Sequence, residues 1–163
     1  MAEETEAAAD PRKSVTVPAT AAEAFRIYTE CPAEWLPAEH TFIPNPRSIT
    51  MEPRAGGRFY ERGDDGSEIT RGTIIEWVPP HRIAVTWRIG PGWRPILDDE
   101  HASVIVAEFT PAGPDATEVT LTYTHLDRHG DMAGMLRAAI ENPGSGDALQ
   151  RYADVVARNA TTS

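Results

Sequence analysis

Three residues near the ends of predicted strands have side chains that could transfer protons. Tyr123 and His125 are two positions apart, and Glu108 follows Val104 and Val106 at the same spacing. Because alternate residues of a strand share one face, each of the three would lie among apolar side chains. Burial raises the pKa of a carboxyl group and histidine titrates near neutral pH, so both suit acid or base catalysis. The competing interpretations are a half-buried histidine with satisfied hydrogen bonds and a glutamate that reaches water at a strand end.

The other residues capable of chemistry lack the partners that known sites need. The run 98–101, with the sequence DDEH, could hold a metal ion, but acidic loops are usually only solvated. Cys31 is the single cysteine and has no spaced Cys or His partner for zinc. The glycine pair at 56 and 57 lacks the lysine of a phosphate-binding loop, which favours a bulge or tight bend. We therefore expect no metal and no cofactor, and no Gly-x-Ser-x-Gly nucleophile motif is present.

Tryptophans supply much of the aromatic surface that could recognise a planar ligand. Trp35 and Trp93 lie in predicted loops, where they could line the mouth of a pocket, whereas Trp77 and Trp87 lie in predicted strands and could equally be core residues. Apolar residues of the final helix would close the pocket from the other side. The full set expected to contact a ligand is Trp35, Phe59, Trp87, Trp93, Glu108, Tyr123, His125, Leu149 and Tyr152.

A strand, a helix and a meander of strands must position these residues. A strand over 14–17 ends at Pro18, and Thr20 can cap a helix whose Glu23 occupies the capping-box position. The proline-rich segment 32–46 predicts a loop that carries aromatic residues. Period-two patterns between turn residues predict a sheet of six or seven antiparallel strands, the later ones at 48–52, 58–62, 68–78, 82–89, 102–110 and 117–126.

One face of this sheet is apolar and needs a cover. In the last strand Val119, Leu121 and Tyr123 alternate with threonines, as in a half-covered antiparallel sheet. A short helix is predicted over 131–142, and a second over 148–159 carries Leu149, Tyr152, Val155 and Val156 at helical spacing. The sequence thus predicts an α+β fold in which a curved antiparallel sheet wraps a long C-terminal helix and leaves a gap between them.

Length and charge narrow the possible partners. The 163 residues suit one domain, predicted over 14–163, after an acidic, disordered tail over 1–13. The formal net charge of -10 repels phosphate backbones and anionic lipids, so we expect neither nucleic acid nor a membrane as a partner. The N-terminus lacks the apolar core of a secretory signal, and the lone cysteine suits a reducing compartment, so we expect a cytoplasmic protein. A homodimer is plausible.

Several local sequences resemble one known family. They are RAGGRF at 54–59, GTIIEWVPPHRI at 72–83, FTP at 109–111 and TEVTL at 117–121. In this order, over roughly residues 14–160, they resemble the activator of heat-shock chaperone ATPase homologue-like family, within the START-like (birch-pollen-allergen-like, SRPBCC) superfamily. The resemblance implies a helix-grip domain that binds a hydrophobic ligand. Relatives often have Gly-Trp at the start of the final helix, whereas this chain has Gly146-Asp147.

Three functions remain open at this point. The first is a non-enzymatic protein that binds a small hydrophobic or aromatic molecule between the sheet and the C-terminal helix. The second is a cyclase or hydrolase that uses the same cavity, with His125, Tyr123 or Glu108 transferring protons. The third, a chaperone ATPase regulator, is suggested only by the family's name, and one fold can serve many functions.

Overall fold

A computed structural model describes residues 10–142 and 147–161 of the chain. Its main feature is a seven-stranded antiparallel sheet with the strand order β2-β10-β9-β6-β5-β4-β3. The strands are β2 (Arg12–Val17), β3 (Ser48–Met51), β4 (Arg58–Arg62), β5 (Glu68–Val78), β6 (Arg82–Trp87), β9 (Ser103–Gly113) and β10 (Ala116–Thr124). The short strands β7 (Ile89–Gly90) and β8 (Arg94–Pro95) form a separate pair.

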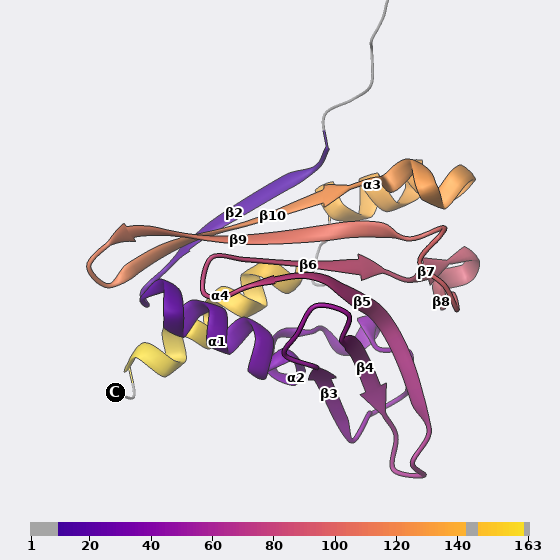
Figure 1. The fold of residues 1–163 in the computed structure, drawn as a ribbon, viewed down its shortest axis with the longest axis horizontal. Helices are drawn as coiled ribbons and strands as arrows, with labels where there is room; N and C mark the ends of the chain where they lie inside the picture. Colours follow the sequence, from indigo (N-terminus) through magenta and orange to yellow (C-terminus); the bar gives the residue numbers. More distant parts are fainter. Residues whose placement is uncertain (1–9, 143–146, 162–163) are drawn as a thin grey trace, which may run out of the picture.

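The helices lie mainly on the inner side of this sheet. They are α1 (Ala21–Glu30), α2 (Pro32–Trp35), α3 (Ala133–Glu141) and α4 (Ala148–Thr161), with 3-10 turns η1 (Ala38–His40), η2 (Pro91–Trp93) and η3 (Leu126–Met132). The sheet curls so that β3 and β4 come round towards α1 and α2, while α3 lies beyond the end of β10 (Figure 1). This confirms the predicted α+β fold, a curved sheet wrapped on a C-terminal helix.

The start of α1 forms as its sequence predicts. The Thr20 hydroxyl accepts a hydrogen bond of 3.2 Å from the Glu23 amide, which satisfies one free donor of the first turn. The Glu23 side chain does not return to the cap but pairs with Arg26. Buried Phe25 and Tyr28 then face the core. The apolar stripe of α1 therefore anchors the helix on the sheet.

The N-terminal boundary differs from the prediction. Strand β2 begins at Arg12, so Arg12 and Lys13 belong to the sheet rather than to the tail predicted over 1–13. They pair with Thr122 and Leu121 of β10. The strand was predicted from its β-branched residues, but backbone pairing can extend beyond them to charged residues. The remainder of the predicted tail, residues 1–9, lies outside the described residues.

The helix α4 fills much of the apolar face. Its residues Leu149, Tyr152, Val155 and Val156 are all buried, which confirms the predicted stripe. The Tyr152 hydroxyl donates a 2.6 Å hydrogen bond to the carbonyl of Ala24, joining α4 to α1. Among the described residues, no helix has the length and hydropathy required to cross a membrane.

Candidate ligand cavity

A cavity of about 470 Å³ remains between the inner face of the sheet and the helices. Its size falls in the range of small-molecule sites. Every strand of the sheet and each of the helices α1 to α4 contributes to the wall, which is largely apolar and aromatic. The apolar lining is Tyr28, Trp35, Leu36, Phe42, Met51, Phe59, Val85, Trp87, Ile89, Trp93, Ile105, Leu121, Tyr123, Ala139, Ile140, Ala148 and Leu149.

Trp35 and Tyr28 form one aromatic wall. Their rings stack with centroids 4.8 Å apart, and the Trp35 Nε1 donates a 3.1 Å hydrogen bond to the Tyr28 carbonyl. Trp35 was expected in a loop at the pocket mouth, but it ends the short helix α2 and is 5% exposed. Proline at the first helical position favours this turn, which explains the difference. Burial raises the pKa of Tyr28, so its hydroxyl stays protonated.

Trp87 and Tyr123 form a second aromatic wall. Their ring centroids are 5.9 Å apart, and both side chains line the cavity. Burial raises the pKa of Tyr123 to about 12, so this phenol is a neutral hydrogen-bond donor at physiological pH. Trp93 lines the same cavity from η2 but is 47% exposed, which places it at the opening.

A buried ion pair stands at the β4–β5 side of the cavity. Arg71 lines the cavity and pairs with Glu61, and their side chains are only 8% and 0% exposed. The Glu61 carboxylate also accepts hydrogen bonds from the amides of Phe42 and Ile43, at 2.9 and 2.8 Å. Burial lowers the pKa of Arg71, but the adjacent carboxylate opposes that shift and favours the charged form. The pair therefore fixes the segment that carries Phe42.

A second ion pair lies on the opposite side, in the edge strand β2. The Lys13 ammonium is 3.6 Å from the carboxylate of Asp147, just before α4, and both residues line the cavity. Lys13 also donates to the carbonyl of Ile140 in α3 at 3.3 Å. These contacts join β2 to the helices that close the cavity.

Six of the nine predicted ligand contacts line the cavity. They are Trp35, Phe59, Trp87, Trp93, Tyr123 and Leu149. The other three, Glu108, His125 and Tyr152, are absent from its wall. Tyr152 is fully buried in the core, where its hydroxyl is satisfied by Ala24.

Glu108 lies on the outer face of the sheet, and its predicted position on the inner apolar face is wrong. It is half exposed and accepts a 2.8 Å hydrogen bond from Arg82 of the adjacent strand. The alternation was misleading because β9 is apolar on both faces. Val104 and Val106 form a small outer cluster, while Ile105 and Phe109 face the core.

His125 is exposed and does not continue the pattern of β10. The strand ends at Thr124, and His125 takes a left-handed conformation with φ of 58° at the start of η3. This turn removes its side chain from the face that Leu121 and Tyr123 share. The structure therefore contradicts the expectation of a histidine inside the cavity.

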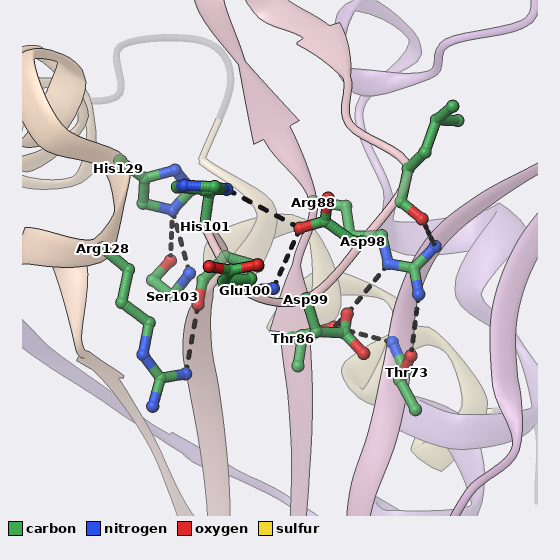
Figure 2. A network of polar contacts seen from close by, with 12 residues as sticks. Thr73, Thr86, Arg88, Asp98, Asp99, Glu100, His101, Ser103, Arg128 and His129 are labelled. Atoms are coloured by element: carbon green, nitrogen blue, oxygen red, sulfur yellow. Dashed lines mark hydrogen bonds and ion pairs between the residues drawn. The ribbon is translucent and has the colours of Figure 1, made fainter.

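The acidic run 98–101 divides into two groups (Figure 2). Asp99 accepts hydrogen bonds from Thr86 and Arg88, at 2.7 and 2.9 Å, and so fastens its loop to β6. Asp98, Glu100 and His101 are exposed, with possible ligand atoms within 4.8 Å of one another. Exposed acidic groups of this kind are usually solvated, and we assign no metal to them.

Sequence reasoning missed the buried pair of Arg71 and Glu61. Glu61 was detectable, because it is two residues after Phe59 and therefore shares its face. Arg71 was not, because it is the extra residue of a bulge: Phe59 pairs with Gly72 while the next residue, Tyr60, pairs with Thr70. A bulge shifts the phase of alternation and turns a side chain to the other face.

Chemically, the cavity combines large aromatic surfaces with a few polar donors. Tyr123 can donate a hydrogen bond, and the Arg71 guanidinium can donate to an oxygen atom. The elements of this fold and its cavity define a helix-grip, START-like protein, which is a class of ligand-binding domains. Comparison with known proteins agrees with this class.

Residues 18–150 match the family described as "Activator of Hsp90 ATPase homolog 1-like protein". The chain belongs to this family, which confirms the resemblance seen in the sequence. No curated protein matches the chain.

Solved structures extend the comparison. An anthrahydroquino-γ-pyrone synthase, Txn09, is 42% identical over 91% of this chain and 97% of its own, with a TM-score of 0.64. CalC from Micromonospora echinospora, a self-sacrificing resistance protein, is 28% identical over 93% of this chain and 96% of its own, with a TM-score of 0.69. The protein NE0264 from Nitrosomonas europaea, 19% identical over 93% and 96% of the two chains with a TM-score of 0.61, shares the fold.

Proposed function

We propose that this protein binds a planar aromatic small molecule in the cavity between the sheet and α4. The observation that carries the proposal is the aromatic lining of a cavity of about 470 Å³. Each 100 Å² of apolar ligand surface buried there would contribute about 2.5 kcal/mol. The 42% identity to a synthase that makes a fused aromatic product supports the choice of an aromatic ligand.

Filling the cavity tests this proposal. Ile105 lines the cavity from β9, and Ile105→Trp would occupy part of it. The matched control is Ile75→Trp, because Ile75 is 48% exposed and outside the cavity. Polycyclic aromatic compounds, including 9,10-anthraquinone, would be screened by thermal unfolding. A ligand at a hundredfold its Kd stabilises the native state by about 2.7 kcal/mol, which raises Tm by about 5–10 °C.

We expect this shift in the native chain and in Ile75→Trp, and its loss in Ile105→Trp. A panel of hydrophobic compounds that shifts none of the three Tm values would refute the proposal. An equal shift in all three would place the binding site elsewhere. Mass spectrometry of small molecules retained through purification provides a second readout.

Catalysis of ring closure is a second candidate, favoured by the identity to the γ-pyrone synthase. Tyr123 is the residue for this role, because it lines the cavity and its phenol, kept protonated by a pKa of about 12, can donate a hydrogen bond to an oxygen of the reacting molecule. The purified chain would be incubated with an anthrahydroquinone bearing the uncyclised side chain. We expect product formation to fall at least about tenfold in Tyr123→Phe and to persist in the outside control His125→Ala. A native chain that binds the compound without converting it would exclude this candidate alone.

The chaperone-regulator alternative rests on the family's name. Membership of a family carries the fold, whereas activity depends on the site. Binding to a chaperone is therefore not proposed.

A further inference from the structure

Arg71 has a hydrogen-bond donor that pairs with no described residue of the chain. The Nε of Arg71 is buried and has no hydrogen-bond partner among the residues that the structure describes. Its side chain is 8% exposed and lines the cavity. Buried donors are nearly always paired in folded proteins, so the guanidinium of this cavity-lining residue keeps hydrogen-bonding capacity that its described protein partners leave unsatisfied.

The rest of the guanidinium is held firmly in place. Its Nη1 donates to the Glu61 carboxylate and, at 2.8 Å, to the carbonyl of His40. Its Cζ lies 5.1 Å and 5.3 Å from the ring centroids of Phe42 and Phe59, so the two rings restrain its position. A polar group fixed in this way is pre-organised for one direction of hydrogen bonding.

The bulge in β5 creates this arrangement. Arg71 is the additional residue there, because Phe59 pairs with Gly72 whereas Tyr60 pairs with Thr70. A Cβ on Gly72 would lie 1.9 Å from the carbonyl oxygen of Thr86 in β6. The bulge therefore turns Arg71 towards the cavity, and the close approach of β6 requires glycine at the next position.

Resting on the function proposed above, we propose that Arg71 is the specificity-determining residue of the cavity and hydrogen-bonds an oxygen acceptor of the aromatic ligand. The ligand class is an uncharged polycyclic aromatic that carries a ketone or phenol oxygen. An uncharged acceptor fits because Glu61 already neutralises Arg71, and an added carboxylate would lie near the buried Glu61 charge. In this arrangement the ring system of the ligand lies against the aromatic walls of the cavity, and its oxygen points towards the Arg71 guanidinium.

Two probes of the same shape separate the polar contact from apolar burial. 9,10-Anthraquinone has two carbonyl oxygens, whereas anthracene has none. Dissociation constants would be measured by quenching of protein fluorescence, because Trp35, Trp87 and Trp93 line the cavity. A hydrogen bond to a charged donor is worth about tenfold to a hundredfold in affinity. We expect the native chain to prefer anthraquinone by that factor and to bind anthracene-9-carboxylate more weakly than anthraquinone.

Variants assign this preference to Arg71. Arg71→Met should abolish the preference for anthraquinone while leaving anthracene affinity within about threefold. Because this change leaves Glu61 buried without its partner, Glu61→Gln/Arg71→Met is measured alongside it, with circular dichroism to confirm folding. The matched control is Arg82→Met, since Arg82 forms its ion pairs on the outer face.

The outcomes separate the two proposals. Equal affinities for anthracene and anthraquinone in the native chain, or a preference that survives in the folded double variant, would overturn the role of Arg71 and leave aromatic binding intact. Tighter binding of the carboxylate than of anthraquinone would overturn the uncharged ligand class. Binding of none of the probes would count against both proposals, and the cavity-filling variant would then show whether other aromatic compounds enter.

Discussion

Ion pairs in this protein occupy two different environments. Glu61 and Arg71 are buried together, whereas Glu108 and Arg82 meet on the outer face with side chains 41% and 38% exposed. Exposed pairs contribute at most about 1 kcal/mol, but a buried charge that loses its partner costs about 3–5 kcal/mol. An ion pair of glutamate and arginine therefore affects stability much more on the inner face of this sheet than on its outer face.

Glu61→Gln should strongly destabilise the protein. The substitution preserves shape but leaves the Arg71 charge buried without its carboxylate, so we expect the free energy of unfolding to fall by about 3–5 kcal/mol. Urea unfolding followed by circular dichroism measures the change. The matched control, Glu108→Gln, should cost less than about 1 kcal/mol, and equal losses in the two variants would contradict the buried role of Glu61.

Among the strands of the sheet, β5 departs most from regular pairing. Its register shifts against β4 between Phe59 and Tyr60, and against β6 between Ile74 and Glu76. Bulges increase local twist, which helps the sheet to curl around its helices. Position 72 of this strand requires glycine, because the backbone there closely approaches Thr86.

Gly72→Ala should disturb the pairing of β5 with β6. The new Cβ would meet the Thr86 carbonyl oxygen at 1.9 Å, and backbone atoms cannot move aside as a flexible side chain can. We expect a loss of stability at or above the upper end of about 1–3 kcal/mol, measured by urea unfolding. Gly134→Ala in α3 is the control, because a Cβ there meets nothing within 4 Å. It should be neutral or stabilise by up to about 1 kcal/mol, and a comparable loss in both variants would refute the steric explanation.

The segment formed by η3 and α3 lies at one end of the sheet, beyond β10. The ring centroid of His129, in η3, is 6.2 Å from that of Trp87. Its Nε2 accepts a 3.0 Å hydrogen bond from the Ser103 amide (Figure 2). An imidazole that accepts at Nε2 must be unprotonated there. Burial accordingly lowers the pKa of His129.

The stability of the native chain should therefore fall at mildly acidic pH. An unfolded histidine takes up a proton below about pH 6.5, whereas folded His129 resists protonation until its lower pKa is reached. Its contribution is complete above about pH 6.5 and is lost as the pH falls from there through the folded pKa. The free energy of unfolding would be measured in urea at several pH values between 5 and 7.5. It should change less steeply with pH for His129→Gln than for the native chain. The control His101→Gln changes a side chain that is 67% exposed, and its slope should match that of the native chain.

The order of elements and the inner face of the sheet were predictable from local pattern. The bounds of β4 and β5 agree with the prediction, and Val119, Leu121 and the stripe of α4 are buried as expected. These features follow from alternation, helical spacing and turn residues, which act over a few neighbouring positions. The aromatic character of the cavity could be predicted for the same reason.

The polar part of the site was decided only by tertiary structure. Period-two alternation identifies which residues share a face, but not which face is inner when both are apolar, and so it misplaced Glu108. A left-handed residue and a bulge each broke the period, which removed His125 from the cavity and brought Arg71 into it. Such breaks depend on how distant strands and helices pack together, and the sequence of one strand alone carries no record of that packing.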